Sequence, residues 1–132
     1  MPGPQAQVVV DTSQTLATIS KNVLGMNMAG WYDITQSGLA SAMQSTGVAM
    51  LRWPGGSLAD DYHWQDGSYC GSYVNPNSTF DNFMHDVAQP GAMKVAITVN
   101  YGTNIACNGP GDPAEAAAWV DYANNQQHYG IK

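Results

Sequence analysis

The sequence predicts an α/β domain with a parallel sheet. Short apolar runs alternate with helix-like segments, and each run passes into a loop rich in glycine, asparagine or aromatic residues. Three such strand–helix units occupy residues 23–130, which is the spacing of a (β/α)8 barrel, where roughly 250 residues give about 31 per unit. We therefore expect a partial (β/α)8 barrel over 23–132, preceded over 1–22 by an extra N-terminal strand and lead-in.

The N-terminal third supplies the extra strand and the first unit. Gln7–Val10 is a β-branched run that predicts the extra strand, and Val23–Met28 predicts the first strand of the sheet. Asp33 or Thr35 is suited to cap a helix over about 34–45, because their side-chain oxygens accept from backbone N–H groups of a first turn.

The second unit begins with Ala49–Trp53, an apolar strand that Pro54-Gly55-Gly56 ends. After a long loop, Ser78-Thr79-Phe80-Asp81 has the pattern of a capping box and predicts a helix start. The apolar residues of this helix recur at positions i, i+3, i+4 and i+7, which predicts one buried face: Phe80, Phe83, Met84 and Val87.

The third unit begins with Lys94–Asn100, a nearly continuous apolar run that is typical of a parallel strand covered on both faces. Asp112-Pro113-Ala114-Glu115 predicts the next helix start, with Asp at the N-cap, Pro at N1 and Glu at N3. We expect this helix to end near 128–130 and Ile131-Lys132 to begin a new strand.

Composition excludes some partners. The chain has four Lys and Arg residues and a net charge of −6, so a nucleic-acid partner is not expected, because phosphate binding needs clustered cations. No apolar stretch approaches the ~18–20 residues of a membrane span. The N-terminus lacks the basic and apolar regions of a signal peptide, so we interpret the chain as a mature secreted or periplasmic protein.

The two cysteines, Cys70 and Cys107, follow the second and third strands. Loops that leave the same end of neighbouring parallel strands are close in space, which favours a disulfide between them and an oxidising compartment. The alternative is two unrelated thiols.

The strand–loop motifs resemble a known family. Leu51-Arg52-Trp53-Pro54-Gly55-Gly56-Ser57 is similar to the Arg-Tyr-Pro-Gly-Gly segment at the second strand of clan A glycoside hydrolases, in particular α-L-arabinofuranosidases and neighbouring endoglucanase-like families. Gly25-Met26-Asn27 resembles their first strand, and residues 99–103 and 116–124 resemble their third strand and following helix. The resemblance covers about 20–130 and only the N-terminal part of the family's barrel.

The resemblance implies hydrolysis by two glutamates without a cofactor. The chain has one glutamate, Glu115, whose N3 position predicts capping of its own helix. We therefore expect a truncated barrel fragment without conventional glycosidase activity. In the family an arginine at the place of Arg52 supports the nucleophile, so we expect Arg52 to pair with Asp60 or Asp61 here; the alternative is an arginine facing solvent.

Two other functions remain open. Asp60, Asp61 and His63 offer two carboxylates and an imidazole, a set that suits a zinc-like divalent metal. In that hypothesis Asp61, His63 and Arg52 are the catalytic residues of a small ester or phosphodiester hydrolase. The third hypothesis is a non-enzymatic domain that binds glycan or mediates assembly.

Polysaccharide binding and self-association complete the expectations. Aromatic and polar side chains on the strand-end loops suit stacking against sugars, and we assign substrate binding to Trp31, Ser57, Tyr62, Trp64, Asn100 and Tyr101. A sheet of three or four parallel strands leaves open edges and one bare face. We therefore expect a homodimer or higher homo-oligomer.

Overall fold

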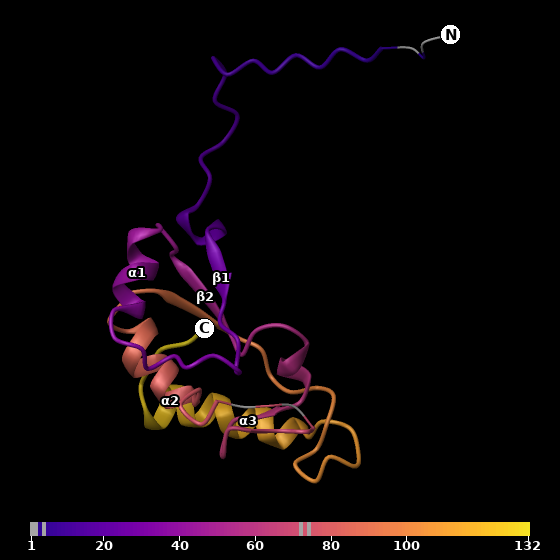
Figure 1. The fold of residues 1–132 in the computed structure, drawn as a ribbon, viewed down its shortest axis with the longest axis vertical. Coiled ribbons are helices and arrows are strands. Elements are labelled where there is room, and N and C mark those ends of the chain that lie inside the picture. The colour runs from indigo at the N-terminus through magenta and orange to yellow at the C-terminus, as the bar shows by residue number, and fades with distance from the viewer. Residues whose placement is uncertain (1–2, 4, 72, 74) are drawn as a thin grey trace.

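The computed structural model describes residues 3, 5–71, 73 and 75–132. A three-stranded sheet, a two-stranded hairpin and three helices form its body (Figure 1). In chain order the strands and helices are β1 (Gly25–Asn27), α1 (Leu39–Ser45), β2 (Met50–Trp53), β3 (Tyr62–His63), β4 (Ser68–Tyr69), α2 (Phe80–Asn82), β5 (Lys94–Ile97) and α3 (Pro113–Asp121). Short 3-10 helices cover Lys21–Val23 and Ser57–Asp60, and π-helical turns extend α2 over Phe83–Ala88 and α3 over Tyr122–Gln126.

The main sheet is parallel, with the order β1-β2-β5, which confirms the predicted parallel α/β architecture. Leu51 of β2 lies between Met26 of β1 and Val95 of β5 in register. The hairpin of β3 and β4 is antiparallel and interrupts the connection between β2 and α2. The observed strands are shorter than predicted, because the ladder of paired backbone groups ends where the loops diverge.

The two faces of β2 have different surroundings. Leu51 and Trp53 are fully buried, and Trp53 stacks on Phe83 with ring centroids 5.3 Å apart. Arg52 points to the other face and is exposed, as is Asn27, its partner in register on β1. The core therefore lies on one side of the sheet, and the other side carries Arg52 and Asn27 together with Met50 and Ala96.

The helix starts differ from prediction in two places. The first helix begins at Leu39 rather than 34, because Gly38 in the left-handed region (φ 84°) breaks the path, and Asp33 caps a local turn at Thr35 instead. The second helix takes Thr79 as its N-cap, which accepts from the Asn82 N–H. All four predicted apolar residues of that helix are buried.

The last helix begins as predicted, with the Asp112 side chain accepting from the Ala114 N–H and Pro113 at N1. Its helical path ends at Gln126, earlier than expected. The segment at Ile131 forms no strand in the structure; instead the Asn124 side-chain amide accepts from the Ile131 N–H at 2.8 Å and donates to its carbonyl at 2.9 Å.

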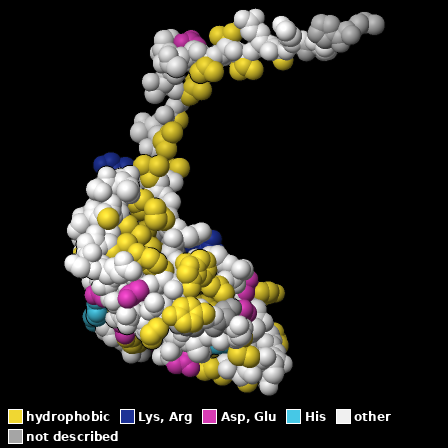
Figure 2. All heavy atoms as spheres, in the orientation of Figure 1, with side chains coloured by type: hydrophobic (Ala, Val, Ile, Leu, Met, Phe, Trp, Pro, Cys, Tyr) yellow, Lys and Arg dark blue, Asp and Glu magenta, His cyan; other side chains and the backbone are white. Residues whose placement is uncertain are grey.

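The prediction of a strand at Gln7–Val10 is wrong. The N-terminal segment runs away from the body as an extended tail (Figure 1), and Val8, Val9 and Val10 are 84%, 80% and 78% exposed. A β-branched run forms a strand only when a partner strand supplies hydrogen bonds, and none lies beside the tail in the described chain. Figure 2 shows apolar side chains along this tail and over the adjacent body.

Within the described residues, no helix combines the length and apolarity that crossing a membrane requires.

Candidate functional site

The candidate site lies at the carboxyl ends of β1, β2 and β5, where three loops leave the sheet together. Backbone hydrogen bonds join these loops: the Gly55 N–H donates to the Met28 carbonyl at 2.7 Å, and the Gly102 N–H donates to the Asp60 carbonyl at 3.1 Å. In open parallel sheets and barrels this end of the strands is where ligands bind.

The loop after β5 is held by a side-chain turn and a close backbone approach. The Asn100 Oδ1 accepts from the N–H groups of Gly102 and Thr103 at 3.0 and 3.1 Å. A Cβ atom on Gly102 would lie 2.7 Å from the Asp60 carbonyl oxygen, so only glycine lets this loop rest on the loop after β2. The arrangement places Asn100 beside the loop that carries His63.

Arg52 does not form the predicted pair with Asp60 or Asp61. Its Nε donates to Thr98 Oγ1 at 2.9 Å, and among the described residues it makes no ion pair. The strand alternation explains this result, because Arg52 points to the open face of the sheet while the following loop turns away from it. The alternative of a solvent-facing arginine is the one observed, with Thr98 fixing the plane of the guanidinium.

His63 is fully buried, and its partner is Glu115. Its Nδ1 lies 3.0 Å from Oε1 and 3.1 Å from Oε2 of that carboxylate, across 52 residues of chain. The prediction that Glu115 caps its own helix is therefore wrong: Asp112 does the capping, and the Glu115 carboxylate reaches across to the β3–β4 hairpin. Sequence reasoning missed this pair.

The carboxylate fixes the tautomer of His63. A carboxylate only accepts, so the Nδ1 atom carries the proton and donates it. The amide nitrogen of Asn100, 3.5 Å from the same Nδ1, is also a donor and is therefore a neighbour rather than a hydrogen-bond partner. Trp64, the residue after His63, forms a second hydrogen bond to α3, because its Nε1 donates to the Glu115 backbone carbonyl at 3.1 Å.

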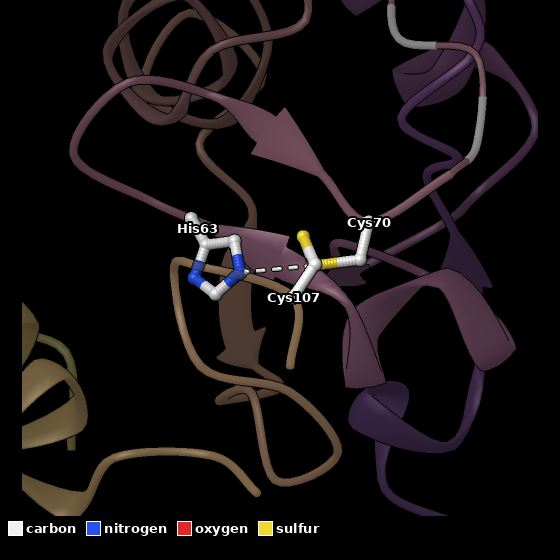
Figure 3. A group of neighbouring side chains, drawn as sticks. All are labelled: His63, Cys70 and Cys107. Atoms are coloured by element: carbon white, nitrogen blue, oxygen red, sulfur yellow. Dashed lines mark hydrogen bonds between the residues drawn. A yellow bond between two sulfur atoms is a disulfide. The ribbon is translucent and has the colours of Figure 1, made fainter. Parts of the chain in front are cut away.

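The disulfide between Cys70 and Cys107 is confirmed. It joins the loop after β4 to the loop after β5, with the two Cα atoms 5.4 Å apart. His63 Nε2 faces this bond at 3.5 Å from the Cys70 sulfur (Figure 3). The His63 imidazole thus lies between the Glu115 carboxylate on α3 and the Cys70–Cys107 disulfide.

The structure does not bring Asp60 and Asp61 to His63. Asp60 is exposed on its 3-10 turn and Asp61 is half-buried, and among the described residues the group of three possible metal ligands around His63 contains neither of them. The reason is the hairpin, which turns His63 inward toward Glu115. A metal at Asp60, Asp61 and His63 would need this loop to rearrange.

The predicted sugar-binding residues separate into two groups. Trp31 and Tyr101 are 54% and 86% exposed, and Ser57 is also exposed. Tyr62, by contrast, is a core residue, 1% exposed and packed edge-on against Trp53 at 4.8 Å. A tyrosine so placed cannot stack on a ligand.

Trp64 and Tyr122 pack against each other in a tilted arrangement, with ring centroids 5.0 Å apart, and both line a cavity of about 340 Å³. The Tyr122 hydroxyl donates to the Asp81 carboxylate at 2.8 and 2.9 Å, and burial together with this hydrogen bond raises its pKa to about 12. Burial also raises the pKa of Tyr69 to about 12 and that of Tyr62 further. These phenols are neutral at physiological pH. Tyr62 and Tyr69 contribute packing, since their buried hydroxyls have no hydrogen-bond partner among the described residues, whereas Tyr122 also contributes its hydrogen bond to Asp81.

Comparisons with known proteins confirm the resemblance to arabinofuranosidases. No family model matches the chain. The intracellular exo-α-L-arabinofuranosidase of Bacteroides ovatus is 30% identical over 89 residues, which is 62% of this chain and 17% of that protein. The crystal structure of the GH51 arabinofuranosidase from Xanthomonas axonopodis pv. citri matches with a TM-score of 0.64 and 23% identity, over 84% of this chain and 27% of that one. The chain therefore spans between a sixth and about a quarter of the length of these proteins.

Proposed function

We propose that this chain forms part of a (β/α)8 barrel and supplies one side of the sugar-binding face of a glycoside hydrolase that acts on α-L-arabinofuranosides. The observation that carries the proposal is Arg52, exposed at the end of β2 with its guanidinium plane fixed by Thr98. The similarity to two arabinofuranosidases supports the same assignment.

The chemistry of Arg52 suits this role. A guanidinium has five N–H donors in a planar fork, and in the described chain only the Nε donor has a protein acceptor. The remaining donors are directed over the open face of the sheet, beside Asn27 in register. Such a fork binds a carboxylate or a pair of sugar hydroxyls through two parallel hydrogen bonds.

In this proposal the chain binds and orients the sugar but does not supply the groups that cleave the glycosidic bond. Retaining glycosidases place two carboxyl groups about 5–5.5 Å apart, whereas the carboxylate of the single glutamate here accepts a hydrogen bond from His63. We therefore expect no turnover of aryl α-L-arabinofuranosides by residues 1–132 alone. A non-enzymatic glycan-binding domain would share the same binding face.

Calorimetric titration with a linear arabino-oligosaccharide tests the proposal. Arg52→Ala should weaken binding at least tenfold, because it removes charged hydrogen bonds worth about 1.5–3 kcal/mol. Lys94→Ala is the matched control, since Lys94 is an exposed cation on the same sheet at the opposite end of β5, and its binding should be unchanged. Equal losses in the two variants, or no binding to the unaltered chain, would contradict the proposal.

We also propose an oxidising compartment for this chain. The interloop disulfide supports that placement, whereas the name of the Bacteroides ovatus protein describes that protein as intracellular. Localising the natural protein in fractionated cells distinguishes the two: recovery outside the cytoplasm with no free thiols supports the proposal, and recovery inside it with two free thiols contradicts it.

A further inference from the structure

The cluster around the buried His63 contains three side chains of types that can bind a metal ion. One ligand atom each from His63, Cys70 and Cys107 lies within 4.8 Å of the others, and Figure 3 shows the imidazole directed at the sulfur pair. We propose that reduction of the Cys70–Cys107 disulfide converts this cluster into a binding site for one zinc ion or a similar thiophilic divalent cation.

The distances support a tetrahedral site. Zinc binds imidazole nitrogen at about 2.0–2.1 Å and thiolate sulfur at about 2.3 Å, so a nitrogen and a sulfur on one ion lie about 3.6 Å apart. His63 Nε2 already lies 3.5 Å from the Cys70 sulfur. The remaining adjustment is that Cys107 must withdraw until the two sulfurs are about 3.8 Å apart.

The hairpin and the disulfide loop have complementary roles in that adjustment. His63 and Cys70 are held near each other because His63 pairs in register with Ser68, two residues before Cys70. Cys107, by contrast, is exposed in a loop rich in asparagine and glycine, with its backbone in the left-handed region (φ 56°). Two ligands are therefore positioned in advance, and the third lies where solvent and a reductant reach it.

Glu115 already supplies the support that a zinc-binding histidine needs. Histidines that bind zinc through one nitrogen commonly donate the other N–H to a carboxylate, which fixes the ring and raises its basicity as a ligand. The Glu115 carboxylate accepts the hydrogen bond from Nδ1–H at 3.0 Å, which leaves Nε2 as the lone-pair nitrogen facing the sulfurs. This arrangement explains why a buried histidine with a carboxylate partner lies against a disulfide.

The conversion balances as a two-electron reduction. A dithiol reductant transfers two electrons and two protons to the disulfide and becomes a cyclic disulfide, which leaves two thiols on the protein. Zinc then displaces both thiol protons and binds two thiolates and one neutral imidazole. Solvent at the exposed side of Cys107 supplies a water as the fourth ligand, as in three-ligand zinc sites with an open position.

Cobalt titration of the full chain tests the proposal. After reduction and removal of the dithiol under anaerobic conditions, one equivalent of Co²⁺ should give the intense visible bands of a tetrahedral ion and a thiolate-to-cobalt charge-transfer band, and zinc should remove both. The oxidised protein should show neither. Absence of both signals from the reduced, folded protein would overturn the proposal.

Two variants separate a built site from binding by any pair of thiols. Glu115→Gln keeps the shape of the side chain but removes the carboxylate, so zinc affinity should fall about 10–100-fold, measured by competition with a chromophoric chelator. Asp86→Asn, at an exposed carboxylate on the π-helical extension of α2, is the matched control and should change nothing. Equal affinity in Glu115→Gln and the unaltered protein would contradict the proposed support of a zinc-binding His63 by the Glu115 carboxylate.

Circular dichroism covers the case in which reduction alone unfolds the chain. Zinc added to the reduced protein should then restore the near-ultraviolet signal of the packed aromatic residues, because metal binding is coupled to folding at such sites. If zinc binds but the signal does not return, the thiols bind zinc from an unfolded chain and the proposed site does not exist.

Discussion

The disulfide should provide a large part of the stability of this chain. The Cys70–Cys107 link closes a loop with a sequence separation of 37, and the chain-entropy relation gives about 3.8 kcal/mol for such a loop at 25 °C. Small domains have a total unfolding free energy of about 5–15 kcal/mol. The double variant Cys70→Ala, Cys107→Ala should therefore lose between a quarter and most of its stability.

Urea unfolding followed by tryptophan fluorescence measures this loss. With an m-value of about 2 kcal/mol/M, the midpoint should fall by about 2 M while the m-value changes little. The unaltered protein reduced by a dithiol in the presence of a chelator is the matched control, because it lacks the disulfide but keeps both sulfur atoms. The two should agree within about 1 kcal/mol.

A loss below about 1 kcal/mol in both samples would refute this reasoning. It would mean that the loops after β4 and β5 stay together without the covalent link. Contacts that hold the loop after β5 to other parts of the chain, such as the Gly102 N–H to the Asp60 carbonyl in the loop after β2, would then fix its position. Disagreement between the two samples would instead identify a packing effect of the alanine side chains.

Three further predictions concern packing, pH and assembly. Gly102→Ala should destabilise the chain by about 1–3 kcal/mol, since the added methyl group meets the Asp60 carbonyl oxygen at 2.7 Å; chemical denaturation measures it, and an unchanged midpoint would mean that the loops separate at no cost. Burial raises the pKa of Tyr62 and raises that of Tyr69 to about 12. The stabilisation from their neutral phenols is therefore complete below the unfolded-state pKa of about 10 and is lost as pH rises through the folded-state pKa values. Phenolate absorbance should rise together with loss of structure, and ionisation of all tyrosines near pH 10 in a folded chain would contradict this prediction. Sedimentation equilibrium should give a dimer, because Leu24 and Met26 on the β1 side are 59% and 43% exposed and an obligate dimer interface covers such apolar surface. A stable monomer at micromolar concentration would contradict this expectation.

Local pattern predicted most of the body of the fold. The strands β1, β2 and β5 and the buried face of α2 were identified because apolar periodicity and turn residues act within a few positions of each other. The errors arose where the outcome depends on distant partners or a single backbone angle. Gln7–Val10 has the composition of a strand but no neighbour in the described chain, and Gly38 delays the start of α1.

The candidate site could be predicted in position but only partly in its contacts. The disulfide followed from topology, since neighbouring parallel strands bring their following loops together. The His63–Glu115 pair did not, because its members are 52 residues apart and each has a plausible local role, in a loop and at a helix N-terminus. The one sequence feature that could have indicated the pair was a single glutamate in a chain with few charged residues. Its position at N3 of a helix predicted a capping role instead.

Chemical-shift mapping by NMR with a linear arabino-oligosaccharide is the most direct test of the proposed sugar-binding face. The amide resonances of Arg52, Thr98 and Asn100, at the carboxyl ends of β2 and β5, should shift progressively with ligand concentration, as should the indole resonance of Trp31. Shifts confined to the opposite end of the sheet around Lys94, or no shifts at any concentration, would contradict the assignment of this face to arabinofuranoside binding.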